Sequence, residues 1–173
     1  PEANDFYFAN TGVQLLVTGR SGNDRACTIL GYKVGSTGGK FSPLGSFTLP
    51  NYDVNFKVTK IATRACDKNN DLVEADLSKL TFLSEVGVNA FKDCKNLAKA
   101  NIPSGIIKTW AFNGCSALSS VTLGPTVTKL DELIFENCTS LRSVSIPPSV
   151  TFIQDGAFEG ASALTSITVD ELC

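Results

Sequence analysis

The chain has 173 residues, 43% of them hydrophobic, which is enough to bury a sizeable core, and it has no apolar run long enough to span a membrane. Its formal net charge is only −2, so neither a nucleic acid nor an anionic membrane is an expected partner. The sequence contains no His, which removes the usual general base and the commonest transition-metal ligand, so we expect no enzyme activity and no cofactor. The chain begins at Pro1, has no Met and shows no signal-peptide pattern, so we expect a processed or trimmed mature segment.

The N-terminal part of the chain predicts short β-strands. "DFYFANTGVQLLVTG" contains two strand-like runs around Thr11 and Gly12, which is a candidate hairpin. "GYKVGSTGGKFSPLGSFTLP" follows, with frequent Gly and Pro and one more short strand, and "FKVTKI" then leads into the rest of the chain. We interpret residues 1–55 as an N-terminal β cap, including irregular first repeats, and a separate folded module is the alternative.

Two loops resemble ligand-binding loops but lack residues that the chemistry requires. "GSTGGK" ends at Lys40 like a phosphate loop, but Val34 stands where the first Gly is needed and Phe41 replaces the hydroxyl residue that would hold magnesium. "DKNND" opens like a calcium loop, but Leu72 replaces its Gly and Ser78 its bidentate Glu. We therefore expect neither a nucleotide site nor a calcium site.

From residue 65 onward the sequence repeats. The pattern AFxxCxxL occurs as "AFKDCKNL" at 90, "AFNGCSAL" at 111, "IFENCTSL" at 134 and "AFEGASAL" at 157, and "ACDKNNDL" at 65 is a degraded copy. Repeats of this length predict a stack of similar coils, because one coil buries too little apolar surface to offset the conformational entropy lost on ordering it.

Each repeat predicts the same local structure. After the repeat leucine, apolar and polar residues alternate as in a strand with one buried face, for example at Val144 and Ile146. A Pro or Gly is expected to end this strand, because Pro has no N–H for the ladder. A second short apolar segment follows, and an acidic residue then precedes a compact segment for which we expect a single helical or 3₁₀ turn.

The motif "LxSVxIPPSVTxIxDGAFEGxSAL" resembles the BspA-like, or treponemal-type, leucine-rich repeat over about residues 56–169. The resemblance implies a mainly β, right-handed solenoid of about five coils, which we assign to residues 56–173. It also implies a secreted or cell-surface protein of adhesion type. Two departures from the pattern indicate irregular early coils: the second coil is two residues shorter at "PSGIIKTWAF", and Cys66 replaces Phe in the first copy.

Cys94, Cys115 and Cys138 occupy equivalent positions in successive repeats, and Ala161 takes that position in the next one. Since a small residue suffices there, we predict buried thiols packed between coils. Neighbouring coils would place these cysteines within disulfide range, so one oxidised pair remains an alternative.

The candidate partner-binding residues are the polar positions that flank the central apolar residue of the first strand in each coil. We predict that they form two outward-facing columns on a concave face: Glu74, Lys99, Ser120, Ser143 and Ser166, and Asp76, Asn101, Thr122, Ser145 and Thr168.

Trp110 and Leu133, two residues before a Phe or its equivalent, form a second candidate contact patch. The alternative for Trp110 is that it folds down and fills the gap left by the shortened coil.

We expect a non-catalytic interaction module that binds a protein, such as a host-matrix or cell-surface protein, or a glycan, and that is a monomer. The alternative is a structural spacer, or a fragment of a longer repeat array, that holds another domain. An enzyme or a glycan-binding domain is a third and weaker reading.

Overall fold

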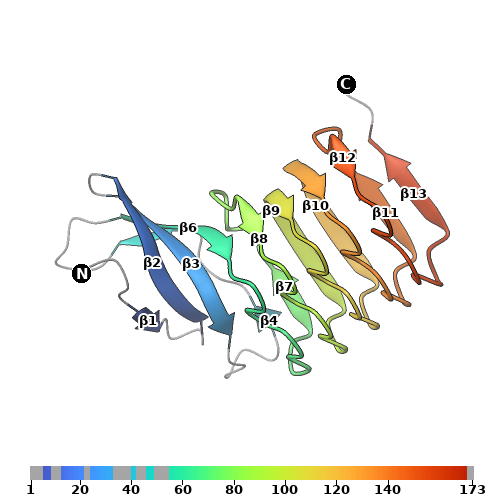
Figure 1. The fold of residues 1–173 in the computed structure, drawn as a ribbon, viewed down its shortest axis with the longest axis horizontal. Helices are drawn as coiled ribbons and strands as arrows, with labels where there is room; N and C mark the ends of the chain where they lie inside the picture. Colours follow the sequence, from blue (N-terminus) through green and yellow to red (C-terminus); the bar gives the residue numbers. More distant parts are fainter. Residues whose placement is uncertain are drawn as a thin grey trace.

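The computed structural model describes residues 6–8, 13–21, 24–32, 40–41, 46–48 and 55–170, and these residues form strands and turns without a helix. Successive coils stack along one direction, from the N-terminal strands to the last coil (Figure 1). The strands are β1 (Phe6–Phe8), β2 (Val13–Ser21), β3 (Asp24–Tyr32), β4 (Lys40–Phe41), β5 (Ser46–Thr48), β6 (Asn55–Ile61), β7 (Glu74–Asp76), β8 (Glu85–Val86), β9 (Lys99–Ile107), β10 (Ser120–Leu130), β11 (Ser143–Ile146), β12 (Phe152–Ile153) and β13 (Ser166–Val169).

The N-terminal strands join the same sheet as the repeats. Strands β1 and β2 pair antiparallel, with Phe6 opposite Leu16, which confirms the expected hairpin, and its turn at Thr11 and Gly12 lies outside the described residues. Strand β3 pairs antiparallel with β2 and parallel with β6. The strand order β1-β2-β3-β6-β8-β9-β10-β12 therefore runs from the N-terminal strands into the solenoid, as a β cap requires.

Two ladders of parallel strands run along the stack. The first ladder joins β4, β7 and the starts of β9 and β10, and β11 with β13 occupies the same position in the last two coils as a separate two-stranded sheet. The second ladder joins the end of β6, β8, the ends of β9 and β10, and β12. Equivalent residues of neighbouring coils are thus partners, which is why the sequence must keep its period.

Proline ends the first strand in only some coils. Strand β11 stops at Ile146, directly before Pro147, as predicted, but β9 and β10 continue through Pro103 and Pro125. The ladder between β9 and β10 shifts its register at this point, between Leu123 and Thr126. Such a shift lets the strand pass a residue without an N–H, so the prediction that Pro always separates two strands was wrong.

A column of phenylalanines fills the centre of the stack. The rings of Phe91 and Phe112 lie 5.0 Å apart, and the steps from Phe112 to Phe135 and from Phe135 to Phe158 are each 5.6 Å between ring centroids. The three rings from Phe91 to Phe135 have no exposed surface, whereas Phe158 is partly exposed. The Phe column therefore connects four consecutive coils through one continuous core.

The cysteine column lies beside the rings and consists of free, buried thiols, as predicted. The thiols of Cys94, Cys115 and Cys138 each lie 2.9–3.3 Å from a backbone carbonyl oxygen of the preceding coil, namely that of Cys66, Phe91 and Phe112. Burial raises the pKa of Cys94 and of Cys138 to about 12. At neutral pH these groups are thiols, not the nucleophilic thiolates.

We expect a thiol reagent to react with few cysteines of the folded chain and with several more after denaturation. Burial keeps the described cysteines protonated and out of contact with the reagent. A colorimetric thiol titration with and without denaturant makes the comparison. If denaturation released no additional thiols, the cysteines would be paired as disulfides and the packing argument would fail.

The compact segment that follows the second strand is a run of turns, where we expected a helical or 3₁₀ turn. Some of its amides bond three residues back, as Ala90 N–H does to the Gly87 carbonyl. The amides of Asn89, Phe91 and Asp93 alternate with these and donate to carbonyls of the next coil. Half of the donors are thus used between coils, and no regular helix forms in these segments because its hydrogen bonds all lie within one segment.

Candidate functional site

The strand register brings the predicted columns together on the first ladder. Lys99 is the partner of both Glu74 and Ser120, and Asn101 is the partner of both Asp76 and Thr122. In the last two coils, Ser143 pairs with Ser166 and Ser145 with Thr168. Their side chains are exposed or half-buried. We call the surface formed by these ten positions the first-strand face.

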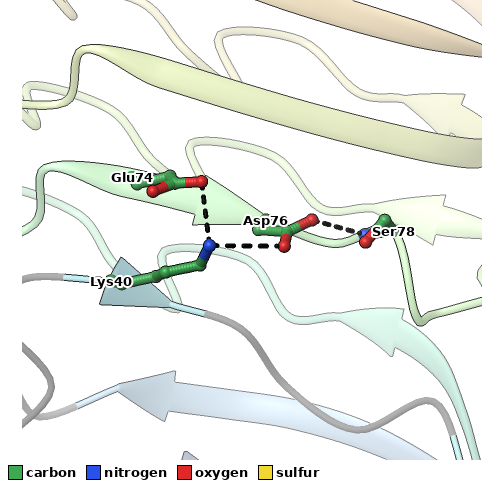
Figure 2. A network of polar contacts seen from close by, with 4 residues as sticks. All are labelled: Lys40, Glu74, Asp76 and Ser78. Carbon is green, nitrogen blue, oxygen red and sulfur yellow. Dashed lines mark hydrogen bonds and ion pairs between the residues drawn. The ribbon is translucent and has the colours of Figure 1, made fainter.

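The acidic end of the first-strand face is occupied by a residue that the sequence analysis did not assign to it. Lys40 reaches from β4, and its Nζ lies 3.0 Å from Glu74 Oε1 and 3.6 Å from Asp76 Oδ2 (Figure 2). The Ser78 amide donates to Asp76 Oδ1 at 3.2 Å. The hydrogen bond to Glu74 is the main reason why the pKa of Lys40 is raised. Glu74 and Asp76 thus form a local ion-pair network and are less available to a partner.

The Ser and Thr side chains at the other end of the first-strand face have few hydrogen-bond partners within the molecule. The hydroxyls of Ser120, Thr122, Ser143, Ser166 and Thr168 are exposed, and within the described part of the chain none forms a side-chain hydrogen bond. Ser145 differs, since its hydroxyl donates to Asp170 Oδ1 at 2.5 Å. Several unused donors and acceptors therefore stand in register on adjacent coils, where they can bind a polar ligand.

Trp110 and Leu133 lie in the turns, away from the first-strand face. Both have positive φ angles, 59° and 56°, a conformation that bulky residues rarely adopt and that Gly156 adopts in the next coil. Trp110 remains 38% exposed, and Lys92 Nζ lies 5.3 Å from the centroid of its indole ring. Part of the ring is therefore open to a partner.

The backbone of the shortened second coil lies close to the preceding coil at Gly105. At Gly105, with φ of +90°, a Cβ would lie only 2.6 Å from the Ser84 carbonyl carbon, so the two coils approach closely there. The neighbouring Ser104 is buried, and its hydroxyl donates to the Leu83 carbonyl at 2.7 Å. The same kind of close approach recurs at Gly87 and Gly124, so small residues at these positions let neighbouring coils pack closely.

The turns also form a small cavity. It has a volume of about 200 Å³ and is lined by Lys68, Asn70, Asp93 and Lys95. Asn70 holds its wall in place, because its Oδ1 accepts the Lys95 amide at 2.9 Å. The lining thus contains two ammonium groups and one carboxylate, that of Asp93, so its formal net charge is +1.

The described residues contain no cluster of three or more side chains suited to a metal ion. Within the same residues there is no helix with the length and apolarity needed to cross a membrane.

The stacked parallel ladders and the buried Leu and Phe columns define a leucine-rich-repeat solenoid. The model of the BspA-type leucine-rich-repeat region, with six copies, matches residues 84–173, just over half of the chain, and the chain therefore belongs to this family. A comparison with curated protein sequences finds no significant match.

Several solved structures share the fold. The leucine-rich-repeat protein of T. pallidum is 25% identical, with a TM-score of 0.72 over 92% of this chain and 70% of that protein. A leucine-rich-repeat protein of Bacteroides ovatus is 23% identical, with a TM-score of 0.77 over 93% of this chain and 40% of that protein. A leucine-rich cell-surface protein of Faecalibacterium prausnitzii is 22% identical, with a TM-score of 0.57 over 98% of this chain and 55% of that protein. The latter two likenesses show the fold alone.

Proposed function

We propose that this chain is a non-catalytic, adhesion-type module of a secreted or cell-surface protein and that it binds a protein partner through the first-strand face. The observation that carries the proposal is the set of exposed, unoccupied hydroxyls on neighbouring strands. Ser and Thr lose little side-chain entropy on contact and can donate and accept hydrogen bonds. One copy carries the whole surface, so this contact does not require an oligomer.

The extracellular location is supported by similarity. A protein described as a cell-surface protein is among those with the same fold. The buried thiols of the described residues are also compatible with export, because their raised pKa and burial protect them from oxidation.

A glycan is the second candidate partner for the same face. It is favoured by the same hydroxyls, which can bond the hydroxyl groups of a sugar, and by Lys99, which is exposed and forms no ion pair with any described residue. The two partner classes differ in what destroys the binding activity of an extract: protease treatment for a protein, periodate oxidation for a glycan.

A spacer in a longer repeat array is the alternative function. Its support is the last coil, where Ile167 and Val169 are 47% and 69% exposed although their equivalents Val144 and Ile146 are buried. A further coil of the same kind would cover these side chains.

Binding should be lost when a long charged side chain is placed among the hydroxyls. We expect the Ser143→Lys variant to retain its melting temperature, because the position is exposed, but to capture at least about tenfold less material from extracellular-matrix and microbial-surface extracts. Thr128→Lys, at an exposed position of the second ladder, is the matched control and should bind like the wild type. Equal capture by both variants would remove the first-strand face as the binding site.

A further inference from the structure

The turns that follow the second strand of each coil form a continuous surface, which we call the turn face. It consists of residues 63–71, 88–96, 109–117, 132–140 and 155–163. Backbone hydrogen bonds hold these segments in register, for example from Trp110 N–H to the Glu132 carbonyl and from Leu133 N–H to the Asp155 carbonyl. Charges at equivalent positions of the five segments are therefore arranged along one line.

The two ends of the turn face differ in net charge, which is 0 for the first segment and +1 for the second but −2 for each of the last two. In its first two segments the bases Arg64, Lys68, Lys92 and Lys95 outnumber the acids Asp67, Asp71 and Asp93. The middle segment has no charged residue. The last two segments contain only acidic charges, at Glu132, Glu136, Asp155 and Glu159.

Most of these charges have no ion-pair partner among the described residues, although Glu136 accepts a hydrogen bond from Asn113 and Lys92 lies over the Trp110 ring. None of the four carboxylates of the last two segments forms an ion pair with another described residue, and the same holds for Arg64, Lys68 and Lys95. The cavity between Lys68 and Lys95 gives the basic end a concave site of carboxylate size. All the basic groups of the turn face thus lie at one end and the other end is purely acidic, and no ion pair among the described residues joins the two ends.

The centre of the turn face is apolar. Trp110 stands in the third of the five segments, 38% exposed, and Leu133 follows in the fourth. Both residues have a positive φ, which Gly156 adopts at the equivalent position of the next coil. The backbone conformation therefore does not explain why large residues stand at these two positions. An exposed aromatic residue at the centre of a charged surface is the usual arrangement of an interface hot spot.

We propose that a second copy of this chain docks on the turn face in antiparallel orientation, with the two-fold axis close to Trp110. Rotation about the third segment places the first segment of one copy opposite the fifth of the other, and the second opposite the fourth. The four bases then face segments that carry only carboxylates, and the two Trp110 rings meet in the middle. Asp67, Asp71 and Asp93 face the same carboxylates and reduce the attraction. The parallel arrangement would oppose like charges, so charge complementarity selects one orientation.

The interface is small and the dimer weak. Five coils spaced about 4.8 Å apart span only roughly 20 Å, which corresponds to the low end of interface sizes and to association at high protein concentration. The net charge of −2 opposes association little. The proposed dimer differs from the monomer that we expected from the sequence. It rests on the position of the two charged groups at opposite ends of one surface, which only the fold shows. The first-strand face lies elsewhere on each coil and remains open in this dimer.

Sedimentation velocity of the full chain over a range of concentrations tests the proposal. We expect a monomer–dimer equilibrium that weakens about tenfold or more when the salt concentration rises from about 20 mM to about 500 mM. The acid-reversed variant Glu132→Lys with Glu159→Lys and the base-reversed variant Lys68→Glu with Lys95→Glu should each be monomeric. A mixture of the two should dimerise again, because each of the four reversed positions then faces an opposite charge in the paired segment of the other copy.

Two further variants distinguish the loss of this interface from a general effect of net charge or of stability. Lys79→Glu with Lys99→Glu changes the net charge as the base-reversed variant does but lies outside the turn face, and it should dimerise like the wild type. Trp110→Gly should weaken the dimer without lowering the melting temperature, because Gly accepts the positive φ. A wild type that stays monomeric at about millimolar concentration, or charge-reversed variants that associate normally, would overturn the proposal.

Discussion

Replacing Phe112 by Ala is expected to lower the free energy of unfolding by about 3–5 kcal/mol. Phe112 has no exposed surface, and its ring stacks on Phe91 on one side and Phe135 on the other. The substitution removes both ring contacts and leaves a cavity in the middle of the stack. Because folded domains are stable by only about 5–15 kcal/mol, this loss would be a large part of the total.

The unfolding transition of the Phe112→Ala variant should also become broader. In a solenoid each coil contacts only its neighbours, so a weak central junction allows the two ends to unfold separately. Urea unfolding followed by circular dichroism measures both the midpoint and the slope. Phe152→Ala is the control and should change stability by less than about 1 kcal/mol. Phe152 is 55% exposed, and its only ring contact among the described residues is with Lys129 Nζ, 5.8 Å from the ring centroid. Similar losses in the two variants would show that the Phe column does not hold the coils together.

Gly105→Ala should destabilise the chain by about 3 kcal/mol, through backbone strain at a positive φ and overpacking. The φ of Gly105 is +90°, and an added Cβ would lie 2.6 Å from the Ser84 carbonyl carbon and 2.7 Å from its oxygen. These are backbone atoms of the preceding coil, so they can move only if the ladder between the coils opens. The melting temperature should fall by roughly 6–12 °C, at about 2–4 °C per kcal/mol for a chain of this size.

Gly31→Ala is the matched substitution for Gly105→Ala. Among the described residues, a Cβ at Gly31 meets only the Ala65 carbonyl oxygen, at 3.5 Å, and Gly31 does not have a positive φ in the left-handed region. Its stability should stay within about 1 kcal/mol of the wild type, or rise slightly because the unfolded chain loses freedom. If both variants melted at the same temperature, the positive φ and the close approach at Gly105 would not constrain the choice of residue there.

The repeat period was sufficient to predict the fold and the composition of the first-strand face. Residues at equivalent positions, such as Ser143 and Ser166, are ladder partners because stacked coils of similar length place them side by side. The same argument placed the cysteines in one buried column. Periodicity is read directly from the sequence, so features that depend only on it can be predicted without coordinates.

Only the tertiary structure showed which of these residues are free to bind a partner. Lys40 pairs with Glu74 across 34 positions of sequence, from a segment outside the repeat period, so no pattern in the sequence connects the two. The positive φ of Trp110 and Leu133 could not be predicted from the sequence either, because neither residue is of a type that normally indicates that conformation. Local pattern determines the position of each side chain along the coil, whereas its charge partners and exposure depend on which distant segments pack against it, and that is decided only when the whole chain folds.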